Sequence, residues 1–179
     1  IYFELLCHWQ KKMNLVSNNS LQDSEIRHFL DSAQLYVFCK KLNGNIIDFG
    51  SGAGFPGAVL SILGASKTFL VESNKKKCIF LKTLKKETNS NFNILNSKIE
   101  NLDFLDPSLI VSRALTSTKN LLLFSIYHML KSKKINSKKE AIKNLPNLLF
   151  LKGKNFKNEL NNIPGSLKIK FQTFPSITS

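Results

Sequence analysis

Residues 46–57 read Ile46-Ile47-Asp48-Phe49-Gly50-Ser51-Gly52-Ala53-Gly54-Phe55-Pro56-Gly57, and the apolar run Ala58-Val59-Leu60-Ser61-Ile62-Leu63 follows. This order is typical of a buried strand, a glycine turn and a helix. Four glycines within eight residues allow left-handed backbone and the close approach of a ligand, and proline suits the first turn of a helix. Because such a helix directs free N–H groups into the turn, the stretch predicts a site for a nucleotide-type cofactor.

The choice between cofactors depends on Asp48, which stands two residues before the first glycine. Read literally, Gly52-x-Gly54-x-x-Gly57 satisfies the dinucleotide fingerprint, and a nicotinamide-dependent oxidoreductase is therefore an open alternative. A carboxylate at the end of the strand would repel a pyrophosphate, but it suits a ligand with positive charge. S-adenosylmethionine carries a sulfonium and an ammonium group, so we expect this cofactor.

The length and charge of the chain restrict the class of protein. Its 179 residues suffice for one domain with one core. Lysine and arginine number 26 against 12 aspartates and glutamates, which gives a formal net charge of +14. Such a charge predicts attraction to a polyanion, and nucleic acid is the natural partner. A membrane surface is the competing interpretation, but no helix sets lysines opposite a broad aromatic face.

Cysteine usage and hydropathy point to the cytoplasm. Cys7, Cys39 and Cys78 lie far apart and lack metal-ligand spacing, so neither a disulfide framework nor a metal site is expected. The chain has no run of about 18 apolar residues and no signal-peptide pattern. We therefore expect a cytoplasmic protein without membrane association, and we expect a monomer.

Residues 1–40 are expected to form an N-terminal helical extension that packs on a main domain of residues 41–179. A first helix within residues 1–15 has apolar side chains at helical spacing, namely Phe3, Leu6, Trp9 and Met13. Asp23 or Ser24 would cap a second helix. Its apolar face would carry Ile26, Phe29, Leu30, Ala33 and Val37. The rest of this helix, where a solvated surface is the simpler interpretation, carries Arg27, His28, Asp31 and Ser32.

The segment after the glycine turn alternates between strands and helices. Strands are expected over residues 67–71, 92–95, 109–111, 148–151 and 167–174. A helix beginning at Lys75 would bury Cys78, Ile79, Leu81 and Leu84, and another would cover residues 118–130. The alternation predicts an α/β fold of the Rossmann-like kind, a mostly parallel sheet with helices on both faces. The lysine-rich residues 131–146 are too polar for a core and are expected as a surface excursion.

Polar and charged residues follow the ends of the expected strands. Carboxyl ends of parallel strands meet at one edge of a sheet, so Asp48, Glu72, residues 97–100, Arg113 and Lys152 should converge on one crevice. An acid at the end of the second strand can accept hydrogen bonds from ribose hydroxyls, and Glu72 is expected in this role.

Six stretches together carry a resemblance to a known family. They are Lys12-Met13-Asn14-Leu15-Val16-Ser17, Arg27-His28-x-x-Asp31-Ser32, residues 47–57, Glu72-Ser73-Asn74-x-Lys76-Lys77-x-x-Phe80-Leu81, Ser112-Arg113-Ala114 and Leu151-Lys152-Gly153. The chain resembles the bacterial small-subunit ribosomal RNA guanine-N7 methyltransferases, the RsmG or GidB family. The glycine stretch alone would indicate only a methyltransferase, whereas the stretches around His28, Arg113 and Lys152 make the resemblance specific.

The resemblance implies a class I methyltransferase that uses S-adenosylmethionine to methylate N7 of a guanine in the 530 loop of 16S ribosomal RNA, of the guanine-527 type. The implied cofactor residues are Asp48, Gly50, Ser51, Gly52, Gly54, Phe55, Glu72, Ile99, Glu100 and Arg113. Arg113 would also lie near the target base, and the other implied substrate-side residues are Asn14, His28 and Lys152. No catalytic base is assigned, because N7 of guanine is already unprotonated.

The chain departs from the family pattern in two places that bear on function. The family commonly has a short turn rich in proline and glycine where this chain has the lysine-rich excursion. The family also closes its sheet with an antiparallel strand after the sixth, for which the residues after 174 offer no clear apolar candidate. A basic RNA-binding relative that has lost catalysis is therefore a second alternative.

Overall fold

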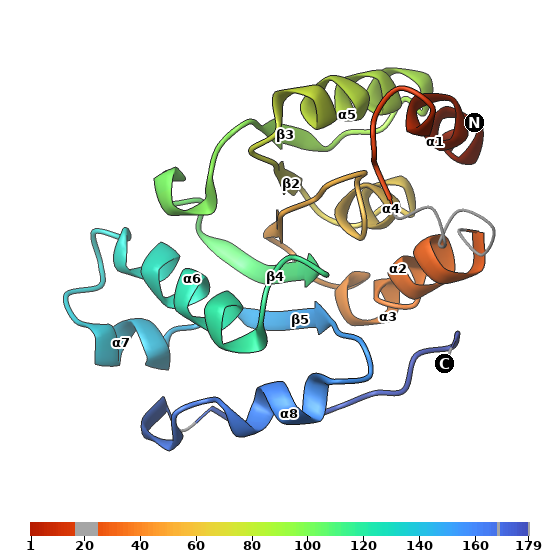
Figure 1. Ribbon diagram of the computed structural model, residues 1–179. Helices are drawn as coiled ribbons and strands as arrows, with labels where there is room; N and C mark the ends of the chain where they lie inside the picture. The colour runs from red at the N-terminus through yellow and green to blue at the C-terminus, as the bar shows by residue number, and fades with distance from the viewer. Residues whose placement is uncertain (17–24, 168, 179) are drawn as a thin grey trace.

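The computed structural model describes residues 1–16, 25–167 and 169–178, and a sheet of five parallel strands lies at its centre (Figure 1). The strands are β1 (Asn45–Phe49), β2 (Thr68–Val71), β3 (Asn93–Leu95), β4 (Pro107–Arg113) and β5 (Asn147–Leu151). Their order is β3-β2-β1-β4-β5, so the chain runs outward from β1 and then returns to its other side. A doubly wound sheet of this kind binds ligands at the carboxyl ends of its strands, beside the switch between β1 and β4.

Helices lie on both faces of the sheet, as the sequence predicts. They are α1 (Tyr2–Gln10), α2 (Asp31–Ala33), α3 (Tyr36–Cys39), α4 (Gly57–Ile62), α5 (Lys75–Glu87), α6 (Thr118–Leu130), α7 (Lys138–Lys143) and α8 (Phe156–Asn161). Alternate strand residues point to opposite faces. Ile46 packs with Leu60 of α4, whereas its neighbour Ile47 packs with Phe124 of α6. Within the described residues, no helix is long and apolar enough to span a lipid bilayer.

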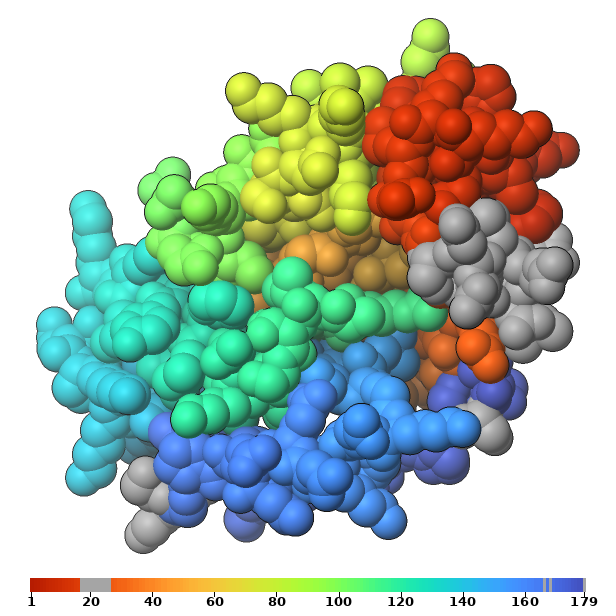
Figure 2. Space-filling view, viewed as in Figure 1, coloured from red at the N-terminus to blue at the C-terminus, as the bar shows by residue number. Residues whose placement is uncertain are grey.

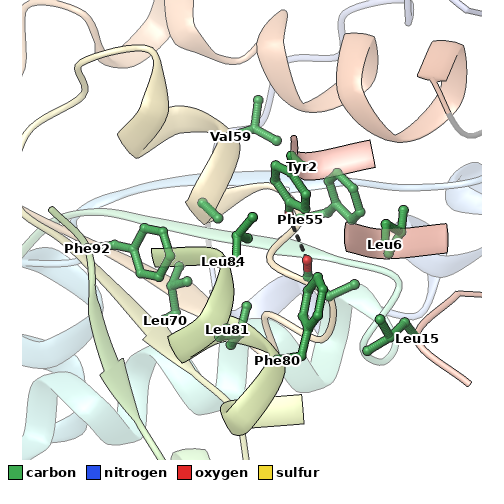
Figure 3. Packing of buried hydrophobic residues seen from close by; sticks show 12 residues of the cluster. Tyr2, Leu6, Leu15, Phe55, Val59, Leu70, Phe80, Leu81, Leu84 and Phe92 are labelled. Atoms are coloured by element: carbon green, nitrogen blue, oxygen red, sulfur yellow. Dashed lines mark hydrogen bonds between the residues drawn. The ribbon is translucent and has the colours of Figure 1, made fainter. Parts of the chain in front are cut away.

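The largest apolar cluster joins α1, α4 and α5 (Figure 3). Trp9 of α1 meets Phe80 of α5 edge to face, with ring centroids 5.9 Å apart. Helix α1 thus packs against α5. The prediction that Ile79 is buried is wrong, because its side chain is 53% exposed and Phe80 is fully buried instead. The inward stripe of α5 runs through Phe80, Leu81 and Leu84, and Ile79 lies outside it.

The second predicted helix is broken into shorter pieces. A π-helix over Glu25–Leu30 precedes α2, and a turn separates α2 from α3. The predicted apolar face is wrong at Leu30 and Val37, which are 45% and 59% exposed. One regular helix would have placed these side chains on a common face. A π-turn contains one more residue than an α-helical turn, so it rotates the side chains that follow it to a different face. The proposed cap at residue 23 or 24 and the side chain of residue 26 lie outside what the structure describes.

The lysine-rich residues 131–146 contain a helix rather than a wholly exposed excursion. Helix α7 is capped by Ser137, whose hydroxyl accepts a hydrogen bond from the backbone N–H of Glu140. Ala141 is fully buried against Ile126 and Met129 of α6. The prediction that this segment is too polar to join a core is therefore wrong on the face that contains Ala141. Ile142 and Leu145 pack against the same cluster, so a few apolar residues seat this short helix while its lysines remain exposed.

The sixth predicted strand is not formed. After β5 the chain forms α8 and a 3-10 turn over Gly165–Leu167, and the described residues from 169 onward contain no strand. Phe171 and Phe174 are 62% and 53% exposed. Leu167, Ile169 and Phe171 alternate with the period of a strand, but a strand also needs a neighbour to receive its hydrogen bonds. In the described part of the chain, β5 is consequently an edge of the sheet.

We expect an Ala141→Asn substitution to lower the free energy of unfolding by about 2–3 kcal/mol, because it places an amide in a fully buried apolar site. Lys139→Asn is the matched control on the exposed side of α7, with an expected change of about 0.5 kcal/mol or less. Urea unfolding of both variants measures the difference. Equal losses would mean that α7 does not pack as described.

Candidate functional site

A pocket of about 860 Å³ opens at the carboxyl ends of the strands. Figure 2 shows a recess in this face of the molecule, between α5 and the segment that follows β4. The pocket is lined from the glycine turn by Gly50, Ser51, Gly52, Ala53 and Phe55, and from the next strand ends by Glu72, Ile99, Glu100 and Arg113. Ligand pockets span roughly 300–1,000 Å³, so this one is large enough for a nucleoside-sized cofactor with space beside it. The predicted convergence of the strand ends on one crevice is seen for these residues.

Asp48 lies behind the glycine turn and does not line the pocket. Its carboxylate is fully buried and accepts a hydrogen bond of 2.9 Å from the backbone N–H of Gly57. Burial raises the pKa of Asp48 to about 7, against the opposing effect of the Gly57 hydrogen bond. The carboxylate therefore faces the turn, as the sequence suggests, but its direct partner in the structure is the start of α4.

Two glycines of the turn serve different purposes. Both have positive φ, +56° at Gly52 and +95° at Gly54. A Cβ on Gly54 would lie 2.5 Å from the hydroxyl of Tyr2, so this glycine is required by internal packing. A Cβ on Gly52 would meet nothing closer than the carbonyl of Gly50 at 3.9 Å. Gly52 borders the pocket, and its bare backbone fits the close approach of a cofactor.

Glu72 joins the end of β2 to the glycine turn. One carboxylate oxygen accepts from the backbone N–H of Gly52 at 2.9 Å, and the other accepts from the N–H of Asn74 at 2.7 Å. The side chain is 8% exposed and borders the pocket. An oxygen in this position can also accept from the hydroxyls of a ribose. Ile99 and Glu100 border the same pocket from a 3-10 turn over Ile99–Asn101 that was predicted as a loop.

A second wall of the pocket is formed by His28, Phe55 and Arg113. The rings of His28 and Phe55 are 5.2 Å apart, and the guanidinium of Arg113 lies 5.7 Å from the Phe55 ring. A guanidinium N–H of Arg113 also donates to the backbone carbonyl of His28 at 3.5 Å, across 85 residues of sequence. Two of the stretches that make the family resemblance specific thus meet in one wall.

The imidazole of His28 is buried and uncharged. Its side chain is 9% exposed, and neither ring nitrogen has a hydrogen-bond partner among the described residues. Burial and, to a smaller extent, the charge of Arg113 together lower the pKa of His28 to about 4. The solvated surface expected for the Arg27-His28 pair is therefore wrong for His28. A neutral imidazole offers one donor and one acceptor but no positive charge.

Two predicted substrate-side residues lie outside the pocket lining. The ammonium of Lys152 forms an ion pair with Glu159 of α8 at 2.7 Å and donates to the carbonyl of Thr116 at 2.8 Å. Glu159 also accepts from the backbone and hydroxyl of Thr118, so this network fixes the start of α6. Asn14 is exposed, whereas the next two residues, Leu15 and Val16, border the pocket. The structure thus places Lys152 and Asn14 beside the pocket rim.

Tyr2 is a site-shaping residue that the sequence analysis missed. Its hydroxyl donates to the carbonyl of Ala53 in the glycine turn at 2.6 Å, and its ring stacks on Phe55 with centroids 5.3 Å apart (Figure 3). The only sequence signal is its place one turn before Leu6, which identifies a helix face but not a partner 51 residues away.

Comparison with known proteins shows the family of the chain. The profile of the GidB family, described as rRNA small subunit methyltransferase G, matches residues 1–175. The chain belongs to this family. A relative named ribosomal RNA small subunit methyltransferase G, from Rickettsia felis, is 38% identical over 160 residues, which cover 89% of this chain and 76% of the relative. One of the same name from Paramagnetospirillum magneticum is 34% identical over 178 residues, covering 99% and 80%.

Solved structures confirm the Rossmann-like fold at low identity. An S-adenosyl-L-methionine-dependent methyltransferase of Methanococcus maripaludis matches with a TM-score of 0.51 and 18% identity, over 73% of this chain and 58% of that one. The magnesium protoporphyrin IX methyltransferase of Synechocystis matches with a TM-score of 0.53 and 11% identity, over 72% and 63%. The chain spans less than two thirds of either structure, and both bear on the fold alone.

Membership of the GidB family makes the chain a small-subunit rRNA methyltransferase by family, and S-adenosylmethionine is its cofactor. The predicted family and cofactor are thus confirmed, and the oxidoreductase alternative has no support. The described residues contain no group of three or more His, Cys, Asp or Glu side chains that could hold a metal ion.

We expect Gly52→Ala to weaken S-adenosylmethionine binding at least about 10-fold, because its methyl group would enter the space that the ligand approaches. Gly64→Ala is the matched control, since Gly64 also has positive φ, at +90°, and a Cβ there would meet nothing closer than the Tyr36 hydroxyl at 3.6 Å, but it lies outside the pocket. Both variants should lose about 1–2 kcal/mol of stability from backbone strain. Titration calorimetry measures affinity, and equal affinities would show that the cofactor does not contact Gly52.

The pKa of His28 should respond to Arg113. Arg113→Ala removes a positive charge, so the pKa should rise above about 4, yet it should stay below 6.5 because burial is the larger cause. Because the folded state disfavours the charged imidazole, His28 costs no stability above pH 6.5. The free energy of unfolding then falls as the pH drops from 6.5 toward 4. An NMR titration of the imidazole measures the shift, with Arg27→Ala as a control of smaller expected effect. An unchanged pKa in Arg113→Ala would contradict the contact between the two side chains.

Proposed function

We propose that this chain methylates N7 of a guanine in the 530 loop of 16S ribosomal RNA, of the guanine-527 type. The observation that carries the proposal is the meeting of two chemically different walls in one pocket of a GidB-family chain. One wall is the glycine turn with Glu72, and the other is the pair His28 and Arg113 on Phe55.

The glycine wall is suited to the cofactor. Asp48 would hold the turn in shape from behind, and Gly50, Ser51, Gly52 and Phe55 would form the cradle of the cofactor, whereas Gly54 packs inward against Tyr2 and would shape the turn. Glu72 would accept from the ribose, and Ile99 and Glu100 would border the adenine. When bound, S-adenosylmethionine supplies an electrophilic methyl group whose bond to sulfur breaks as the bond to N7 forms, so that the sulfur ends neutral and the guanine positively charged.

The residues of the second wall need not act as a base. N7 of guanine has a free lone pair, so the protein has to exclude water and hold the base in line with the methyl group. Arg113 lies close enough to the turn to contact both cofactor and target base. Lys152, held by Glu159 and Thr116, would support the rim instead of gripping RNA directly.

Positive charge around the pocket supports an RNA substrate. Lys77 and Lys98 are among the pocket-lining residues, and the chain as a whole carries +14. Such a field attracts a phosphate backbone without reading its sequence. We propose that the protein acts as a monomer in the cytoplasm, on 16S rRNA or the small ribosomal subunit. A base in a loop is also cheaper to turn into a pocket than one in a duplex.

Mass spectrometry of 16S rRNA tests the proposal directly. We expect N7-methylguanosine in the 530 loop in cells that express the chain and its loss in cells that lack it. Expression of Gly52→Ala in those cells should restore much less of the methyl group than Gly64→Ala does. The proposal fails if the modified nucleotide persists without the chain, or if it lies elsewhere in the RNA. The catalytically inactive alternative predicts RNA binding with no methyl transfer.

A further inference from the structure

His28 has unused hydrogen-bonding capacity that calls for a ligand. Its side chain borders the pocket, is more than nine-tenths buried, and has no partner for either ring nitrogen among the described residues. A buried donor without a partner costs about 1–3 kcal/mol, so proteins rarely retain one without a use. The other buried histidine, His128, accepts at Nε2 from the N–H of Leu105, and although its Nδ1 also has no partner among the described residues, it lies outside this pocket.

We propose that His28 donates a hydrogen bond to O6 of the target guanine and thereby directs the adjacent N7 toward the methyl donor. This inference rests on the proposed function and adds which atom of the base is recognised, and by which side chain. O6 and N7 lie side by side on one edge of guanine. A donor that holds O6 therefore fixes the direction of the N7 lone pair.

The chemistry of the reaction restricts what can contact this edge. Arginine commonly binds guanine with two hydrogen bonds, one to O6 and one to N7. A donor placed on N7 would occupy the lone pair that must attack the methyl group. O6 is therefore the only acceptor of the edge that the protein can hold during the reaction, and a single N–H is enough.

The surroundings of His28 favour a neutral acceptor over a phosphate. The imidazole is held uncharged at neutral pH by its burial and by Arg113. Arg113 already supplies the positive charge of this wall, and it is oriented by the His28 carbonyl and the Phe55 ring. A neutral N–H meeting a carbonyl oxygen satisfies both groups without bringing a further charge into the protein.

Substitution of the target guanine by 2-aminopurine tests this contact, because that base keeps N7 and lacks O6. The RNA is 16S rRNA with either base at the target position, naked or assembled, in the form that the mass-spectrometric assay finds methylated. Methyl transfer is measured for the wild-type chain, His28→Leu, which retains apolar bulk, and His28→Gln, which retains a donor. His8→Ala, at an exposed position on α1, is the surface control.

We expect the wild-type chain to methylate the guanine RNA about 10–100-fold faster than the 2-aminopurine RNA. His28→Leu should reduce this preference to about 3-fold or less by slowing only the guanine reaction, and His28→Gln should restore part of it. The affinity for S-adenosylmethionine, measured by calorimetry, should stay within about 3-fold in every variant, which also shows that the variants fold.

The inference is overturned if His28→Leu is slower but keeps the wild-type preference, since the contact would then not involve O6. It is also overturned if His28→Leu loses cofactor affinity in proportion to activity, because His28 would then be a cofactor ligand. If the wild-type chain binds S-adenosylmethionine and methylates neither RNA, the proposed function itself fails. Comparison of this preference between variants cancels the intrinsic difference in N7 reactivity of the two bases.

Discussion

Two carboxylates at the ends of adjacent strands hold the glycine turn from its two sides. Asp48, on β1, accepts from the N–H of Gly57, and Glu72, after β2, accepts from the N–H of Gly52. Because β1 and β2 are paired in register, the distance between these two acids is set by the sheet. The turn therefore receives its shape from the strands as well as from its own glycines, and the pocket floor depends on that shape.

The N-terminal extension completes the site instead of merely covering the domain. Tyr2 reaches the turn through its hydroxyl and stacks on Phe55, and Phe55 in turn contacts His28 and Arg113. The glycine turn and the wall of His28 and Arg113, which we propose binds the target base, are thus joined by one aromatic ring. The methyl donor and the acceptor base can be positioned by the same few residues, which matters for an in-line displacement.

Local patterns predicted the glycine turn, the parallel strands β1 to β5 and helix α6, because strand and helix periods are properties of consecutive residues. The pocket members Gly52, Glu72, Ile99 and Arg113 followed from their places after strands. These inferences needed only the rule that parallel strands end at one edge. The expected RNA target came from the family resemblance alone, because the periodicity of the sequence carries no information about a substrate.

The predictions that the structure contradicts concern residues whose positions depend on partners distant in the sequence. His28 was expected at a solvated surface because a regular helix was assumed, and the π-turn before α2 reverses that expectation. Lys152 was expected to face the substrate, yet its ion-pair partner Glu159 lies on a helix that carries no distinctive motif. Leu167, Ile169 and Phe171 alternate like a strand, but the described residues from 169 onward form none. Each case turns on a contact or register that sequence spacing does not reveal.

The buried carboxyl group of Asp48 also links the cofactor to protons. With a pKa raised to about 7 by burial, Asp48 is only partly ionised at neutral pH. A sulfonium and an ammonium arriving on the other side of the turn favour its ionised form, so ligand binding releases a proton from the core. Linkage is reciprocal, and removal of that proton must strengthen binding. We therefore expect the affinity for the methyl donor to rise with pH across neutrality, although Asp48 lies outside the pocket lining.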